Sequence, residues 1–228
     1  MGTGYSMQNA PDSGYLYKVR IVKVADFQDG GLRMYPYTLA ILVLELAITR
    51  ISPHDAATWL MEVFPVIFVL PLVWHLGRKG KISPLLQILI IVHAGVLCVG
   101  GHYTYALVPA GEWVKNLGIG TRNNYDKLGH FVQGFIPAIA IREIFMRVRY
   151  WDGHKVLMSF VVVLVCGGIS ALYEILEMLA ALWMGQGADA FLGTQGYVWD
   201  TQTDMATALI GAFIAVFLFE KAHRKQIT

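Results

Sequence analysis

Charged residues are scarce in this chain of 228 residues, of which 15% are Asp, Glu, Lys or Arg and 56% are hydrophobic. A soluble domain is typically about one quarter charged, so the composition argues against an ordinary soluble protein. The formal net charge is only +2, and the basic residues form no continuous patch. A protein that binds nucleic acid through its phosphates needs such a patch, and we therefore expect no nucleic-acid partner.

The chain also has only two cysteines, Cys98 and Cys166, and both lie within apolar runs. Cysteines in that setting are expected to be small packing residues rather than a disulfide or a metal pair. Residues 1–34 are polar and precede the first apolar run, so we expect no cleavable signal peptide. The sequence shows no internal repeat and no alternating pattern typical of a membrane barrel.

Long apolar runs, in contrast, are abundant. About 20 apolar residues suffice to cross a bilayer as a helix, and a helix satisfies its own backbone polar groups in lipid. The sequence predicts an all-α, polytopic membrane bundle of about six transmembrane helices within residues 35–222. The expected spans are Tyr35–Ile51, Ala57–Leu76, Pro84–Val108, Lys127–Val148, Lys155–Trp183 and Asp204–Ala222.

Lysine and arginine are distributed unevenly between the two sets of connections. Thirteen flank the spans on the side that carries both termini, and four lie on the other side. Because cytoplasmic connections of membrane proteins are enriched in these residues, both termini are expected in the cytoplasm. Residues 1–34 are then a cytoplasmic or interfacial arm, and residues 223–228 form a basic cytoplasmic tail.

Ionisable residues lie inside or beside several spans, and the predicted topology places many of them in the outer third of the bilayer. These are His102, Asp126, Lys127, His130, Glu174, Glu177, Asp200 and Asp204. Such side chains cost about 2.5–3.5 kcal/mol each on insertion scales and usually face the bundle interior or a wet cavity. We therefore expect a shared polar site beneath the outer surface, and an apolar inner half of the bundle.

Sequence spacing indicates which of these side chains share a helix face. Asp126 and His130 are four residues apart, and Glu174 and Glu177 are three apart, so each pair projects from one side of its helix. Several carboxylates in a small volume repel one another unless they are protonated, paired with cations or bound to a metal, and Lys127 alone cannot balance them. Taken singly, Asp126 can be a helix cap and His130 a hydrogen-bonded core residue.

Together these features favour a metal-dependent membrane enzyme, a hydrolase or transferase that acts at the outer face on a lipid or lipid-linked substrate. The expected metal ligands are His130, Glu174, Glu177 and Asp204, and the expected catalytic residues are Asp126, Glu174, Asp200 and His102. Carboxylates with an imidazole suit Zn²⁺, Mn²⁺ or Fe. The Glu-x-x-His motif of di-iron helical bundles is absent, because Glu177 stands at the third position after Glu174.

Two other functions stay open. A proton- or cation-coupled transporter would use the same groups as a titrating relay, although a single polar depth and the lack of repeat symmetry argue against it. Six helices are also few for a carrier unless it dimerises, so a homo-oligomer stays open. A non-catalytic assembly or sensor protein would use the cluster only to join helices, and buried charge is a poor source of stability.

Three stretches carry a resemblance to a known family: "NYDKLGHFVQGF" at 124–135, "ISALYEILEM" at 169–178 and "GYVWDTQTDMATALIGA" at 196–212. Over roughly residues 36–222 the sequence resembles the YjdF-like family of predicted bacterial inner-membrane proteins. The resemblance implies a six-helix protein of the bacterial inner membrane and no particular reaction. A fainter likeness is to the VanZ-like family, through Asp126, Lys127, His130 and Phe131, although Ala208 stands where that family has an asparagine.

Overall fold

The computed structural model describes residues 30–148, 154–184, 194–221 and 223. This part of the chain has seven α-helices and no strand, which confirms the predicted all-α class. The helices are α1 (Gly30–Thr49), α2 (Ala56–Gly77), α3 (Pro84–Tyr103), α4 (Pro109–Asn116), α5 (Tyr125–Val148), α6 (Lys155–Met184) and α8 (Asp200–Leu218), with a short 3-10 helix, η1 (Tyr105–Leu107), after α3. Most of the predicted arm, residues 1–29, and of the predicted tail, residues 224–228, lies outside the described residues.

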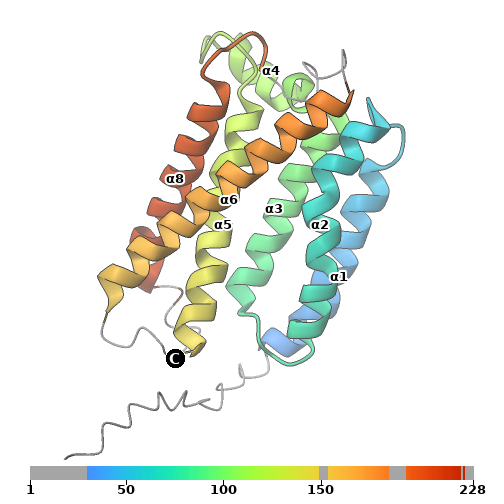
Figure 1. Cartoon of the computed structure of the whole chain (residues 1–228). Coiled ribbons are helices and arrows are strands. Elements are labelled where there is room, and N and C mark those ends of the chain that lie inside the picture. The colour runs from blue at the N-terminus through green and yellow to red at the C-terminus, as the bar shows by residue number, and fades with distance from the viewer. Residues whose placement is uncertain (1–29, 149–153, 185–193, 222, 224–228) are drawn as a thin grey trace, which may run out of the picture.

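The six long helices run side by side as one bundle, and α4 lies at the end where α5 and α8 begin (Figure 1). The packing between α5 and α8 is the most extensive in the bundle, and α5 also contacts α3 and α6. Helices α1, α2 and α3 pack against one another to form the other half. Helix α5 therefore lies at the centre, where its polar residues can meet several neighbours.

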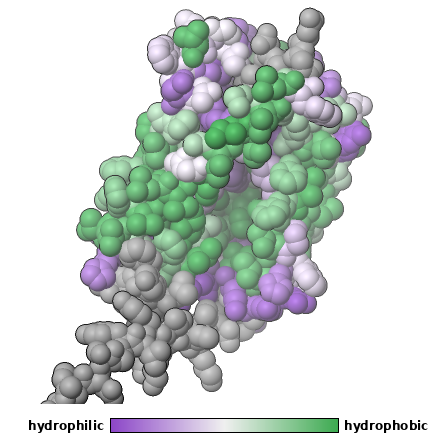
Figure 2. Space-filling model, in the orientation of Figure 1, coloured by the Kyte–Doolittle hydropathy of each residue, from purple (hydrophilic) through white to green (hydrophobic). Residues whose placement is uncertain are grey.

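The outer surface of the bundle is suited to lipid. Figure 2 shows a broad apolar band with hydrophilic residues toward both ends. Among the described helices, α2, α3, α6 and α8 have the length and apolar composition needed to cross a membrane. Helix α5 carries charged residues, among them Arg142 and Glu143, which are buried inside the bundle rather than exposed to lipid. The structure thus confirms a multi-pass helical membrane protein.

Local sequence explains where several helices begin and end. The Asp55 carboxylate caps α2 by accepting a hydrogen bond of 2.7 Å from the Thr58 backbone N–H, and this bond holds the pKa of Asp55 below its usual value. The predicted third span ran to Val108, but α3 ends at Tyr103, because Thr104 adopts a φ of +56° that a helix does not continue. Helix α8 begins at Asp200, four residues earlier than predicted.

Small residues let α5 and α8 approach closely. A Cβ atom at Gly134 would overlap the carbonyl oxygen of Ala208, and one at Gly211 would overlap the carbonyl oxygen of Phe131. Glycine and alanine at a helix crossing allow such close backbone contact in membrane proteins. The crossing fixes the start of α5 relative to the start of α8, which is where the predicted site lies. The two cysteines are buried and free, as predicted.

Candidate functional site

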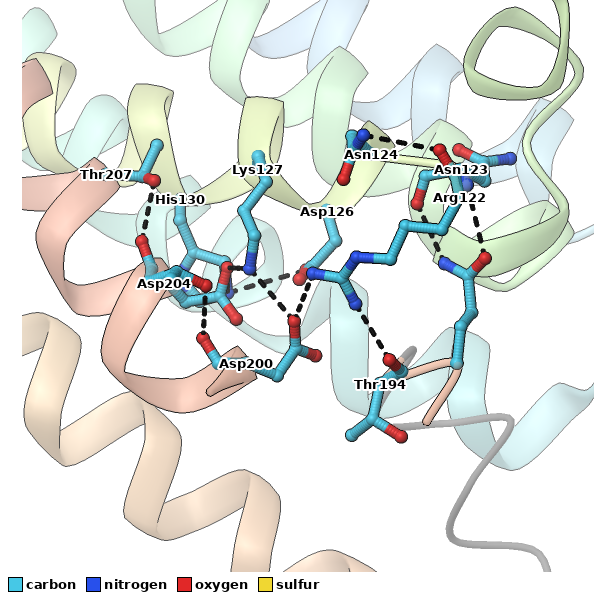
Figure 3. A network of polar contacts seen from close by, with 12 residues as sticks. Arg122, Asn123, Asn124, Asp126, Lys127, His130, Thr194, Asp200, Asp204 and Thr207 are labelled. Atoms are coloured by element: carbon cyan, nitrogen blue, oxygen red, sulfur yellow. Dashed lines mark hydrogen bonds and ion pairs between the residues drawn. The ribbon is translucent and has the colours of Figure 1, made fainter. Parts of the chain in front are cut away.

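The first turns of α5 and α8 and the second half of α6 bring most of the predicted site residues together. Figure 3 shows the part of the site formed by α5 and α8. We call the following five residues the acidic cluster: Asp126 and His130 from α5, Glu174 and Glu177 from α6, and Asp204 from α8. His130, Glu174 and Asp204 are buried, and the other two are half-buried. The sequence-based expectation that these distant stretches meet is therefore confirmed by the geometry.

His130 lies at the centre of the acidic cluster. Its Nε2 atom is 3.4 Å from Asp126 Oδ1, 3.5 Å from Glu174 Oε1 and 3.9 Å from Asp204 Oδ1. These separations exceed the 2.7–3.2 Å of an ordinary N–H···O hydrogen bond. The other ring nitrogen, Nδ1, lies 3.0 Å from the Gln133 Oε1 acceptor, so Nδ1 carries a hydrogen and Nε2 faces the carboxylates.

Two sets of three ligand atoms share His130: one includes Asp126 and Asp204, and the other Glu174 and Glu177. Within each set the atoms lie within 4.8 Å of one another. Ligand atoms around a tetrahedral zinc, at bond lengths near 2.0–2.2 Å, are about 3.3–3.6 Å apart, and the His130 separations from Asp126 and Glu174 fall close to this value. Glu174 Oε1 is buried and makes no hydrogen bond within the described part of the chain.

Arg122 and Lys127 supply positive charge beside the cluster. Lys127 Nζ donates to Asp200 Oδ1 at 2.9 Å and also to Asp204. Arg122 donates to Asp200 and, at 2.8 Å, to the Thr194 carbonyl oxygen. Helix spacing could not reveal Arg122, because it lies in the connection before α5. Both cations act on Asp200, and the remaining carboxylates keep an excess of negative charge.

The connection before α5 determines whether Asp126 caps that helix. Asn123 Oδ1 accepts a hydrogen bond of 3.1 Å from the Tyr125 backbone N–H, and Asn123 Nδ2 donates to the Val108 carbonyl oxygen at 2.9 Å. Gln195 Nε2 donates to the Asn123 carbonyl oxygen at 2.8 Å, which ties this connection to the one before α8. Asn123 therefore takes the capping role that the sequence left open for Asp126, whose carboxylate approaches His130 instead.

The structure places His102 outside the acidic cluster. Its Nδ1 atom lies 2.9 Å from the Thr49 carbonyl oxygen at the end of α1, and its ring packs edge-on against Tyr103. Among the described residues it makes no hydrogen bond, ion pair or ring contact with the cluster. The depth of His102 follows from its position in the sequence of α3, but the direction in which its side chain projects does not. Asp200 lies beside the cluster and forms ion pairs with Arg122 and Lys127.

Glu62 of α2 extends the acidic region, although it was not among the predicted site residues. It is buried, and the Tyr173 hydroxyl donates to its Oε2 atom at 3.3 Å. The Tyr105 hydroxyl also bonds its carboxylate. The Tyr105 ring fills the space beside Gly100 and Gly129, where a Cβ atom would come within 3.0 Å of it. The two tyrosines thus hold Glu62 against the edge of the site.

A second buried polar network lies near the other end of α5. We call Ser83, Arg142, Glu143, Arg147 and His223 the Glu143 network. Glu143 accepts hydrogen bonds from Ser83 Oγ at 2.6 Å, from the Ser83 backbone N–H at 3.0 Å and from Arg147 at 3.0 Å, and it lies 3.1 Å from His223 Nε2.

The Glu143 network corrects two expectations. The prediction of an apolar inner half is wrong, because Arg142 and Glu143 are fully buried there. His223, which was assigned to the tail, is also fully buried, and its Nδ1 atom lies 3.4 Å from Arg142. Charged residues near a helix end usually reach the interface, and nothing in the sequence indicated that partners 60 and 80 residues away would bury Glu143.

One cavity connects the two networks. It has a volume of about 390 Å³ and is lined by residues of α2, α3, α5 and α6. Asp126, His130 and Glu177 line one end, and Glu143 and Arg147 line the other. Most of the wall between them consists of leucine, isoleucine, valine and proline side chains.

These observations define a class: a multi-pass helical membrane protein with a buried carboxylate and histidine site at one end of its bundle. Residues 34–225 match the family model described as "Predicted membrane protein (DUF2238)", and the chain belongs to that family. It is 52% identical over 187 residues to the inner membrane protein YjdF of Escherichia coli (strain K12), which covers 82% of this chain and 88% of the relative. No solved structure matches. The resemblance to the YjdF-like family is confirmed, and the protein is a multi-pass inner-membrane protein.

Proposed function

We propose that this protein is a metal-dependent hydrolase or transferase that acts on a lipid or lipid-linked substrate at the outer face of the inner membrane. The observation that carries the proposal is the convergence of His130, Glu174 and Glu177, whose ligand atoms lie within 4.8 Å of one another. Three protein ligands and an open position are typical of catalytic zinc sites. The unbonded Oε1 atom of Glu174 supports this set over the one with Asp204, whose carboxylate is held by Lys127.

Each residue of the region has a distinct role in this proposal. His130, Glu174 and Glu177 bind Zn²⁺, Mn²⁺ or Fe, and Asp204 lies close enough to join them. A divalent metal in such a site lowers the pKa of bound water and supplies a nucleophile. Asp126, beside His130, would serve as a general base. Asp200 positions Arg122 and Lys127 and does not contact the metal.

The proposed topology has six spans, with α1 and α5 crossing beside the four apolar helices and both termini in the cytoplasm. The Lys- and Arg-rich connections support it. The variant Gln195→Cys is expected to react with an impermeant maleimide on intact cells, whereas Lys79→Cys at the other end of the bundle is expected to be protected. The reverse pattern would contradict the orientation. Background labelling is expected to be low, because Cys98 and Cys166 are buried.

Metal analysis of detergent-purified protein tests the proposed centre. We expect about one equivalent of a transition metal per chain, and its loss from Glu174→Gln and from Glu177→Gln. Asp126→Asn should keep the metal, because a base is not a ligand. The matched control is Glu112→Gln, which alters an exposed ion pair with Lys115 outside the acidic cluster. Wild-type protein that is metal-free after purification and after incubation with Zn²⁺ and Mn²⁺ would contradict the proposal.

A proton- or cation-coupled carrier is the second candidate. The observation that favours it is the cavity, which reaches polar groups at both of its ends. Between those ends the wall is mostly apolar, with His93 and Gln133 as polar exceptions, and ions cross hydrophobic constrictions poorly, which argues against a carrier. Metal-free protein that shows pH-dependent substrate flux in vesicles would favour the carrier.

A further inference from the structure

We propose that the cavity between α2, α3, α5 and α6 binds one hydrocarbon chain of a membrane lipid, with the polar head of that lipid at the acidic cluster. The assignment rests on the proposed function, because it takes the acidic cluster as the place where the head reacts. Binding of the chain itself needs neither metal nor turnover.

The walls of the cavity suit a hydrocarbon chain. Val66, Leu97 and Ile136 line it and are buried within the bundle, so the cavity extends into the interior and is more than a groove between surface side chains. Its volume of about 390 Å³ lies within the range of about 300–1,000 Å³ that is usual for ligand pockets. An apolar lining favours an apolar occupant, since a polar ligand would lose its hydration there without gaining hydrogen bonds.

The cavity is also about as long as the hydrocarbon core of a bilayer is thick. Asp126 and Arg147 both line it, and 21 residues of helix between them correspond to about 32 Å at 1.5 Å per residue. The hydrocarbon core of a bilayer is about 30 Å thick. A chain that starts at the acidic cluster therefore finds a mostly apolar wall, interrupted by His93 and Gln133, over a depth close to that of the surrounding lipid.

An opening toward the membrane gives a lipid access to this space. Leu72 of α2, Ile144 of α5 and Ile169 of α6 line the cavity and are themselves exposed on the side of the bundle. Figure 2 shows the surface hollowed between α2 and α6, where the apolar band surrounds the opening. A lipid can thus enter sideways from the bilayer without moving its chain through water.

The polar groups at the two ends of the cavity decide which end holds the head of the lipid. At one end, Glu143 already accepts hydrogen bonds from Ser83 and Arg147 and lies against His223, and Lys81 and Arg147 line the cavity there. At the other end, Glu174 Oε1 makes no hydrogen bond within the described part of the chain, and His130 Nε2 faces carboxylates at 3.4–3.9 Å. The unbonded carboxylate oxygen of Glu174 lies at the acidic cluster, and the head is placed there with its ammonium toward that oxygen.

Photocrosslinking tests the proposal with the full-length protein in vesicles of phosphatidylethanolamine and phosphatidylglycerol. The probe is a phosphatidylethanolamine that carries a diazirine either near its glycerol or at mid-chain, and mass spectrometry locates the labelled residues. We expect the mid-chain probe to label Leu97 and Ile136, and the glycerol-proximal probe to label Tyr173. Labelling of Phe213 and Phe217 on the exposed face of α8 alone, or the reverse order of depth, would overturn the proposal.

A matched pair of variants separates the cavity from the general lipid surface. Ala94→Phe places a ring inside the cavity wall and is expected to lower labelling of Ile136 about tenfold, whereas Ala47→Phe on the exposed side of α1 should not change it. Unchanged labelling in Ala94→Phe would overturn the proposal. If Ala94→Phe does not fold, the residues labelled in the wild-type protein still test the proposal. Metal-free protein with labelled Leu97 and Ile136 would contradict the proposed enzyme and retain the lipid site.

Discussion

The acidic cluster and the Glu143 network are both buried on α5, yet their charges are arranged in opposite ways. The Glu143 carboxylate has a donor or a positive partner on every side, from Ser83, Arg147 and His223. The acidic cluster instead gathers four carboxylates around a single imidazole, while Arg122 pairs with Asp200 and Lys127 with both Asp200 and Asp204.

This difference separates a structural site from a candidate functional one. Removing one partner of a satisfied buried network leaves an uncompensated charge, so such a network holds helices in place. An unsatisfied group of like charges destabilises the fold by itself, and it is retained where a ligand, a proton or a metal completes it. Depth in the membrane does not distinguish the two networks, but the balance of partners does.

The largest effect is expected from breaking the Glu143 network. Glu143→Ala removes the carboxylate that Ser83, Arg147 and His223 share, and should lower the free energy of unfolding by about 3–5 kcal/mol. Thermal unfolding in detergent measures the change. The surface pair of Glu112 and Lys115 provides the control, since Glu112→Ala should change stability by about 0–1 kcal/mol. Equal effects of the two substitutions would contradict the structural role of Glu143.

A smaller loss is expected from separating α5 and α8 next to the acidic cluster. Gly211→Ala places a Cβ atom against the Phe131 carbonyl oxygen and should destabilise the protein by about 1–3 kcal/mol through overpacking. It should also move Asp204 of α8 away from His130 of α5; the two side chains lie 3.9 Å apart. Gly168→Ala is the matched control, since no atom lies within 4 Å of the added Cβ. If Gly211→Ala leaves the stability of the protein unchanged, the close crossing of α5 and α8 is not required.

The smallest effect, and of opposite sign, is expected at the acidic cluster. Glu174→Gln removes one of several like charges and keeps the shape of the side chain. In protein freed of metal by a chelator, it should raise the free energy of unfolding by about 1 kcal/mol, because repulsion among the carboxylates falls. Chemical unfolding of the metal-free wild type and variant measures the difference. A loss of stability comparable with that of Glu143→Ala would remove the distinction between the two networks.

Much of the acidic cluster was predictable because helical periodicity and depth are local properties. The i,i+4 pair of Asp126 and His130, and the i,i+3 pair of Glu174 and Glu177, lie where the spacing put them. His102 was at the right depth but projects toward α1, and the sequence carried no information on its direction around α3. Arg122 was missed because its position depends on a connection rather than on a helix.

The sequence by itself determined the helical membrane class of the protein and which of its acidic residues share a helix face, since each follows from hydrophobicity and helical periodicity. Only the tertiary structure decided which charges have partners. Ser83 and His223 reach Glu143 from 60 and 80 residues away, whereas Glu174 Oε1 makes no hydrogen bond in the part of the chain that the structure describes and lies 3.5 Å from His130 Nε2. Pairing in a membrane depends on how helices rotate and pack, and this is a property of the whole bundle rather than of any one segment.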